Sequence, residues 1–213
     1  MFNFFENKNN YQLEDDKTWL DKNTKLKGLY NDLIKKTGKK IFLISYFEAN
    51  LKEISLFFDD LNFKYRHIEH FNEIEKSHDV DEPIYLLTTN WQLRKDILNS
   101  INSLQSAQTF VFLDHYPIFK PEADILNLIG QGQKQTTVQF YNSMDNPFFD
   151  FFGGENIKNA MVKMGINKDE CLSSGLINKS IKKGQQKLEL EIISDRKSDS
   201  IENLFKNNKK NQF

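Results

Sequence analysis

The side chains of this chain that could act as a base, a nucleophile or a metal ligand include four histidines and one cysteine. His115 has the most suggestive position, because it follows the apolar run from Thr109 to Leu113 and the acidic Asp114. In α/β proteins ligands bind at the carboxyl ends of strands, so His115 is a candidate for acid–base or metal chemistry. The alternative is a structural role, in which the strand ends here and Tyr116 packs against the core.

The other candidates for such chemistry have weaker patterns. His67, His70 and His78 fall on a strand edge and in a polar loop, without the helical spacing of a zinc-binding pair, so we expect them to be solvated. Cys171 follows Asp169-Glu170, whose charges should raise the pKa of its thiol, which argues against a nucleophile. A single cysteine also excludes a cysteine-cluster metal site. We therefore expect neither a metal nor a cofactor.

One Gly-Lys pair, Gly38-Lys39, has the residue types of a phosphate-binding loop. Such a loop follows a strand and opens a helix. This pair instead comes after a helical pattern and before the apolar run from Lys40 to Phe47, which is typical of the end of a helix. It is therefore not expected to bind phosphate.

Strand and helix patterns alternate along the chain, and the alternation predicts how the candidate residues are placed. Short apolar runs are typical of buried strands, and apolar residues at helical spacing are typical of amphipathic helices. This order predicts a three-layer α/β fold with a mostly parallel sheet. The expected strands are 40–47, 63–70, 83–89, 109–113 and 135–141, and the expected helices are 15–36, 49–61, 91–104, 121–129, 155–164 and 174–190. The first of these helices is either continuous or broken near Asn23.

The passage from Val138 to Leu188 carries an ordered series of residues that matches a known family. They are Phe140, Tyr141, Ser143, Asp145, Phe152, Gly153, Gly154, Ile157, Lys163, Gly165, Asp169, Glu170, Ile177, Lys179, Ser180, Ile181, Gln185 and Lys187. At these positions the chain resembles SecA, the motor of the preprotein translocase. In that family the passage joins the second RecA-like nucleotide-binding domain to the long scaffold helix. The resemblance implies a degenerate, stand-alone relative of that domain, with an N-terminal helix and a C-terminal helical extension.

The resemblance also implies where a nucleotide site would lie. One nucleotide-binding stretch of the family can be matched only with a one-residue deletion, and both of its glycines are missing here. The matched residues are Thr89, Asn90, Arg94 and Asp96. A second stretch falls near residues 125–135, where Gly130 and Gly132 remain and no arginine does. In the family, arginines of these stretches stabilise the transferred phosphate. Arg94 is expected to be a surface residue on a helix and not such an arginine, and the sequence has no phosphate loop, so we expect no ATP hydrolysis and no enzymatic activity.

Two groups of residues are candidates for contact with a partner. The last expected helix has an apolar face and a basic face, and the basic residues are Lys179, Lys182, Lys183 and Lys187. This face either docks onto a partner or an anionic surface, or is an ordinary solvated helix face. Phe148 and Phe149 either pack in the core, as the resemblance implies, or form an exposed patch for a partner.

Composition indicates a globular protein of the cytoplasm. The chain has 213 residues, a net charge of -1 and a mean hydropathy of -0.62, with no apolar run of transmembrane length and no signal-peptide pattern. We expect residues 1–38 to form an N-terminal segment with an amphipathic helix, and residues 39–152 to form the α/β domain. Residues 153–194 should form the helical extension, and residues 195–213 a basic, disordered tail. The alternative for the tail is that Ile201, Leu204 and Phe205 form one docking turn.

The function expected from these observations is that of a non-catalytic adaptor or binding protein. A protein partner is expected, and the resemblance points to components of the translocase or the ribosome, with nucleic acid contacted only through a ribosome. The alternative is a nucleotide- or RNA-binding module without turnover. A third possibility is an enzyme that uses the edge at His115.

Overall fold

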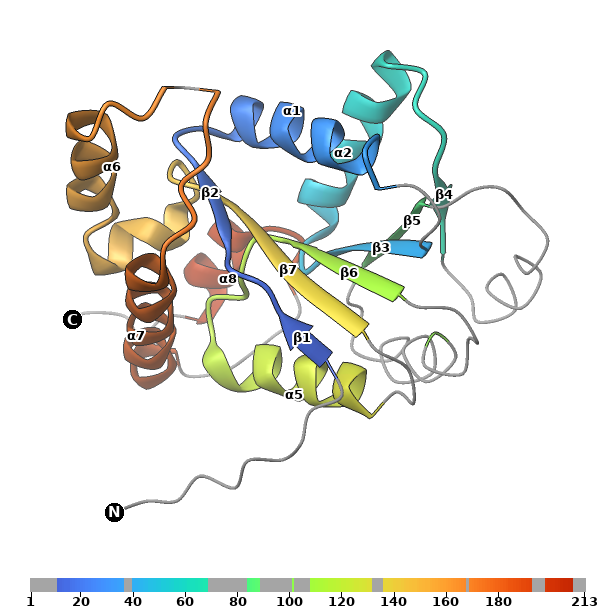
Figure 1. The fold of residues 1–213 in the computed structure, drawn as a ribbon. Coiled ribbons are helices and arrows are strands. Elements are labelled where there is room, and N and C mark those ends of the chain that lie inside the picture. The colour runs from blue at the N-terminus through green and yellow to red at the C-terminus, as the bar shows by residue number, and fades with distance from the viewer. Residues whose placement is uncertain are drawn as a thin grey trace.

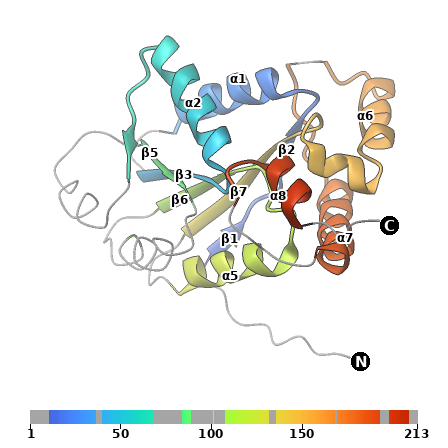
Figure 2. The same ribbon diagram turned by 180° about the vertical axis from the view of Figure 1, so that it is seen from behind.

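The computed structural model describes residues 11–36, 40–68, 84–88, 101, 108–131, 136–167, 169–192 and 198–208, drawn as coloured ribbon in Figures 1 and 2. Its centre is a seven-stranded sheet in the order β1-β7-β6-β3-β5-β4, with β2 also pairing with β7. The strands are β1 (Tyr11–Leu13), β2 (Lys17–Trp19), β3 (Lys40–Ser45), β4 (Arg66–His67), β5 (Ile84–Thr88), β6 (Gln108–Leu113) and β7 (Thr136–Ser143).

All pairs between these strands are parallel. The continuous apolar runs of β3 and β6 are buried along nearly their whole length, as expected for central strands covered on both faces. The predicted α/β class with a mostly parallel sheet is confirmed.

Helices cover both faces of the sheet (Figures 1 and 2). Helices α1 (Lys22–Leu33) and α2 (Glu48–Asp60) cover one face, where Leu29, Leu33 and Phe58 enter one core cluster. On the other face lie α5 (Phe119–Gly130), α7 (Gly175–Glu191) and α8 (Ile201–Asn208), which contribute to a second core cluster. The predicted three-layer arrangement is therefore present.

The N-terminal part of the fold differs from the predicted helix over 15–36. Lys17–Trp19 forms β2 along the edge of β7, and helix α1 begins only at Lys22. Asp21 explains this start, because its Oδ1 accepts the backbone N–H of Thr24 at 2.9 Å and caps the helix. The spacing of apolar residues did not separate the short edge strand from the helix that follows it.

A tight turn connects β7 to the helical extension. The 3₁₀ helix η2 (Pro147–Phe152) ends at Gly153, whose φ of 82° is left-handed, and α6 (Gly154–Lys163) begins next. Phe148 and Phe149 are each only 1% exposed. Of the two interpretations of this aromatic pair, the structure therefore shows core packing, and these side chains offer no surface to a partner.

The C-terminal region differs from the predicted disordered tail. Residues 201–208 form α8, in which Ile201 and Leu204 are buried and Phe205 contacts Phe151 with ring centroids 4.4 Å apart. The carbonyl oxygen of Asp199 also accepts the backbone N–H of Ala49 in the first turn of α2, at 3.1 Å. Apolar residues at helical spacing, although few, are thus sufficient to dock this segment.

Candidate functional site

The chain turns sharply at the carboxyl end of β6. Asp114 has a φ of 75°, a left-handed conformation that is uncommon for residues other than glycine. Its side chain lies on the α1 side of the sheet, where Oδ2 accepts from Nζ of Lys25 at 2.7 Å in a buried ion pair. The next residue, His115, stacks on Phe140 and faces the pocket between α5 and α7. The two neighbours therefore diverge, and they do not form a single catalytic pair.

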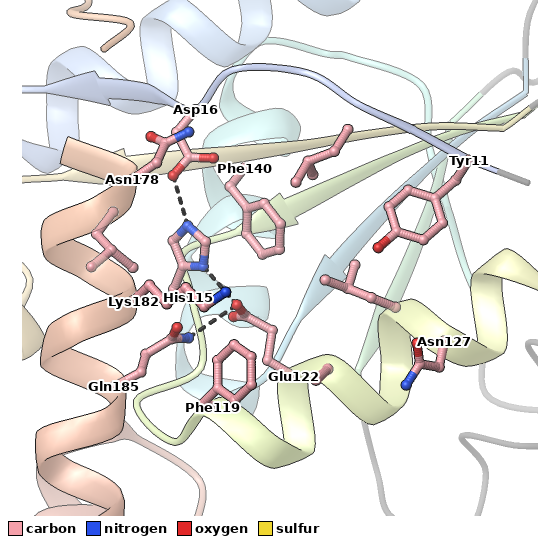
Figure 3. A pocket seen from close by; sticks show the side chains of 14 residues that line it. Tyr11, Asp16, His115, Phe119, Glu122, Asn127, Phe140, Asn178, Lys182 and Gln185 are labelled. Atoms are coloured by element: carbon pink, nitrogen blue, oxygen red, sulfur yellow. Dashed lines mark hydrogen bonds and ion pairs between the residues drawn. The ribbon is translucent and has the colours of Figure 1, made fainter. Parts of the chain in front are cut away.

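His115 is held between two carboxylates (Figure 3). Its Nδ1 lies 2.9 Å from Oε1 of Glu122 on α5, and its Nε2 lies 2.8 Å from Oδ2 of Asp16, in the link between β1 and β2. The imidazole ring is parallel to the ring of Phe140, with centroids 3.9 Å apart and 7° between the planes. Because both ring nitrogens are occupied, neither is available in this arrangement as a metal ligand or a base.

The charge of this cluster follows from its geometry. Burial disfavours the imidazolium, but the negative charges of Glu122 and Asp16, with their hydrogen bonds, outweigh it and raise the pKa of His115 to about 10. His115 is thus an imidazolium at neutral pH and donates to both carboxylates. One cation between two anions leaves the cluster with one net negative charge.

Glu122 ties three parts of the fold together. Its Oε2 accepts the backbone N–H of Tyr116 at 2.8 Å, and its Oε1 also accepts from Nε2 of Gln185 on α7 at 3.0 Å. The same Nε2 of Gln185 lies 2.8 Å from the carbonyl oxygen of Tyr116. Glu122 stands in the first turn of α5, where the helix dipole favours a negative charge. These bonds fix α7 against the connection between β6 and α5.

Asp16 is held in a similar way at the other end of the cluster. Its Oδ2 accepts from Nδ2 of Asn142 on β7 at 3.4 Å. With the side-chain amide of Asn178 turned to donate, Asn178 on α7 reaches the same oxygen at 3.2 Å. The cluster therefore joins the edge of the sheet, α5 and α7.

A pocket of about 300 Å³ opens beside this cluster, between β1, α5 and α7 (Figure 3). Apolar side chains form most of its wall, including Phe119, Leu126, Phe140 and Ile181. Its polar lining includes the His115 cluster and Lys182, whose Nζ lies 5.2 Å from the ring centroid of Phe119. A small pocket with apolar walls and a few convergent polar groups is the usual form of a ligand site.

The residues proposed for nucleotide binding are placed only in part. Thr89, Asn90, Arg94, Asp96 and Gly132 lie outside the described residues. Gly130 is the last residue of α5 and is not among the residues that line the pocket. The predicted nucleotide site therefore stays a prediction.

The basic face predicted for the last helix is present on α7. Ile177, Ile181 and Leu188 are buried on its other face. In the part of the chain that the structure describes, no acidic side chain forms an ion pair with any of the four lysines on the exposed face. These lysines are Lys179, Lys182, Lys183 and Lys187, and all are exposed.

The weaker candidates are mostly as expected. His67 is exposed, and its Nε2 lies 3.1 Å from Oγ of Ser55. His70 and His78 lie outside the described residues. The pKa of the Cys171 thiol is raised, as predicted, but partial burial is the main cause and the charge of Asp32 a smaller one, against the opposing effect of Lys17. The acidic pair before Cys171, which the sequence suggested as the cause, is not among the causes.

The sequence does not mark Asp16 or Glu122 as partners of His115. Glu122 carried a usable signal, because it is an acidic residue in the first turn of the helix expected directly after His115. Asp16 is separated from His115 by 99 positions, and only the pairing of β2 with β7 brings the two together. No pattern local to either residue predicts the contact between Asp16 and His115.

In the part of the chain that the structure describes, none of the helices is both long and apolar enough to cross a membrane. No protein-family model matches the chain. Among solved structures, it is similar to the C-terminal part of the Fun30 ATPase domain, with a TM-score of 0.43, 18% identity, and coverage of 78% of this chain and 54% of that one.

Curated relatives carry the stronger similarity. The SecA subunit of Treponema denticola is 45% identical over 51 residues, which cover 24% of this chain and 6% of that protein. The SecA subunit of Sulfurovum sp. is 36% identical over 59 residues, which cover 28% of this chain and 7% of that protein. The SecA subunit of Solibacter usitatus is 25% identical over 146 residues, which cover 61% of this chain and 15% of that protein.

The chain thus spans between 6% and 15% of the length of these relatives. The resemblance predicted from the residues between Val138 and Leu188 is confirmed: this chain is similar to a limited part of the protein translocase subunit SecA.

Proposed function

We propose that this chain is a non-catalytic adaptor that uses the basic face of α7 to bind an acidic surface of a protein linked to export. The observation that carries the proposal is the division of α7. One face is packed against the domain, and the other presents Lys179, Lys183 and Lys187 to solvent without ion pairs among the described residues. A row of like charges held on a rigid helix favours association with a surface of opposite charge.

The buried face of α7 fixes the helix to the domain, so the exposed lysines are held in place for recognition. Gln185 of α7 is 2% exposed and bonds both Glu122 and the backbone of Tyr116, which anchors the helix to the sheet. Ile181 and Leu188 are buried on the same side. The lysines are therefore presented from a fixed backbone, and binding does not require the helix itself to become ordered.

Two features support the absence of turnover. The sequence has no Gly-Lys-Ser/Thr phosphate loop. At the carboxyl end of β6, Asp114 forms an ion pair with Lys25, and His115 forms ion pairs with Asp16 and Glu122. The charged groups at this edge thus bind one another and leave one net negative charge in the His115 cluster, so they are not arranged to clamp a phosphate chain.

The test is a pull-down from native lysate with the tagged whole chain and a charge-reversed variant, Lys179→Glu with Lys183→Glu and Lys187→Glu. A matched control reverses the exposed Lys27, Lys52 and Lys163 on α1, α2 and α6. We expect translocase subunits to be recovered with the wild type and the control, and lost with the α7 variant.

Equal recovery with the α7 variant would contradict the proposal. Recovery that disappears after ribonuclease treatment would also contradict it, because the basic face would then be contacting RNA phosphates, as in the alternative of an RNA-binding module.

A further inference from the structure

The pocket beside His115 contains a carboxylate oxygen that the described residues leave without a donor. Asp16 lines the pocket and is 3% exposed, and its Oδ2 accepts from His115, Asn142 and Asn178. Within the described part of the chain, no hydrogen bond or ion pair reaches its Oδ1. Oδ1 is not one of the fully buried, unpaired side-chain oxygens of the described residues, so it keeps surface open to the pocket. A carboxylate oxygen accepts hydrogen bonds, so the pocket has a position for a ligand that donates.

The charge around that oxygen selects the kind of donor. His115 is the only cation in contact with the two carboxylates among the described residues, so this end of the pocket carries one uncompensated negative charge. Lys182 also lines the pocket, but its side chain is exposed and its Nζ lies over the ring of Phe119. A monocation close to Asp16 would neutralise the cluster, which a neutral or anionic ligand cannot do.

The walls determine the body of the ligand. Phe119, Leu126 and Ile181 are apolar, and Tyr11 adds an aromatic ring on the side of β1 (Figure 3). The volume of about 300 Å³ is at the lower end of the range for pockets that hold small organic molecules. Aromatic faces also attract an organic cation directly.

We propose that this pocket binds a small organic ammonium ion, whose N–H group donates to Oδ1 of Asp16 and whose aromatic or aliphatic body packs against Phe119, Leu126 and Ile181. The pocket shares only Lys182 with the exposed lysine face of α7, and Lys179, Lys183 and Lys187, which are changed in the adaptor test, do not line it. The two proposals can therefore be tested independently.

Three ligands of nearly the same shape test the proposal: 2-phenylethylammonium, 2-phenylethanol and phenylacetate. The first is a cation that donates, the second a neutral donor, and the third an anion. Calorimetric titration of the whole chain near neutral pH should give a Kd for the ammonium that is about tenfold lower than for the alcohol, because bonds between charged groups are the stronger ones. Phenylacetate should bind more weakly than either.

Two variants locate the binding in this pocket. Asp16→Asn keeps the shape of the side chain and should weaken ammonium binding by about tenfold or more. Ala123→Leu fills the pocket from α5 without removing any member of the His115 cluster, and it should abolish binding. The second variant keeps the test decisive if Asp16→Asn proves too unstable to titrate.

Lys182 distinguishes a cation site from an anion site. Lys182→Gln removes a like charge from the pocket and should strengthen ammonium binding, whereas Lys183→Gln, on the same helix but away from the pocket, should leave it unchanged. Any of three results would overturn the proposal: tighter binding of phenylacetate that is lost in Lys182→Gln, equal ammonium binding by Ala123→Leu and the wild type, or no saturable binding of the ammonium at millimolar concentration.

Discussion

At the scale of single residues, His115 is the side chain on which several parts of the chain depend. Its charge is what allows Asp16 and Glu122 to be buried 2.8 Å and 2.9 Å from the same ring. Breaking a buried ion pair by removing one partner is costly, because it leaves an uncompensated charge in the interior. The position at the end of a strand, which suggested chemistry from the sequence, serves here to hold the edge of the sheet, α5 and α7 together.

His115→Gln should therefore lower the free energy of unfolding by about 3–5 kcal/mol. Adding Glu122→Gln to His115→Gln should lower the free energy of unfolding by much less than an independent substitution would, because it removes one of the two carboxylate charges that His115 had contacted. Urea denaturation of the single and double variants measures both effects. His67→Gln, at an exposed histidine, is the control and should change the stability by less than about 0.5 kcal/mol. If the changes in the free energy of unfolding caused by the two substitutions simply add, the result would count against a charge cluster.

The stability of the protein should also depend on pH through His115. Its pKa is raised from 6.5 to about 10 in the folded state, so the folded chain binds a proton there that the unfolded chain has lost. The stabilisation is complete below pH 6.5 and disappears as the pH rises through about 10. We expect the free energy of unfolding of the wild type to fall across this interval by a few kcal/mol, on the order of 1.4 kcal/mol per pH unit at most. A wild-type profile with the same slope as that of His115→Gln would contradict this assignment.

At the scale of elements, the turn from η2 to α6 depends on two adjacent glycines for different reasons. Gly153 needs a left-handed backbone, with a φ of 82°. A Cβ on Gly154 would lie 2.6 Å from Cβ and 2.7 Å from the carbonyl oxygen of Phe149, so the backbone itself would have to move. The close approach of α6 to η2 thus requires the second glycine.

Gly154→Ala should destabilise the protein by about 1–3 kcal/mol, the usual cost of overpacking. Gly175→Ala, at the start of α7, is the matched control, because its Cβ would meet nothing within 4 Å. That control should be neutral or slightly stabilising, since alanine favours the helix. Thermal denaturation of both variants measures this difference in stability. Equal stability of the two would show that the turn does not require a glycine next to Phe149.

Helix α8 should contribute to the fold despite its position after a polar stretch. Leu204 is fully buried, so Leu204→Ala should cost about 2–5 kcal/mol. Leu190→Ala, at a side chain that is 78% exposed, should cost less than about 0.5 kcal/mol. Hydrogen exchange gives a second measure, because loss of α8 should expose the amide of Ala49, which donates to Asp199. Unchanged protection of that amide in Leu204→Ala would contradict the docking of this segment.

These elements show how far the sequence predicts the fold. The runs of β3 and β6 are long, apolar and buried on both faces, so their assignment needed no tertiary information. The short strand β2 and helix α8 have few residues, and both are stabilised mainly by contacts distant in sequence, with β7 for β2 and with Phe151 for α8. Local patterns indicated a break near Asn23 and a docking turn at Ile201, Leu204 and Phe205 only as alternatives, because they do not contain these distant contacts. The continuous helix over 15–36 and the disordered tail were wrong.

At the scale of the whole molecule, the carboxyl edge of the sheet carries two separate charge groups, one on each face. On one face Lys25 of α1 forms an ion pair with Asp114, and on the other the His115 cluster lies beside α5 and α7. The sequence indicated His115 but could not supply Asp16, because a contact across 99 positions depends on the register of an edge strand. The similarity to SecA was visible in the sequence, since it rests on residue types in order and not on charge geometry.

We expect the chain not to turn over ATP, and phosphate release measures this most directly. The purified whole chain should be incubated with ATP and magnesium. We expect release of phosphate by the whole chain no faster than in buffer, since the sequence contains no phosphate loop and its charged residues at the end of β6 bind one another. Saturable, magnesium-dependent release that follows the protein through purification would contradict the account and identify the chain as an enzyme.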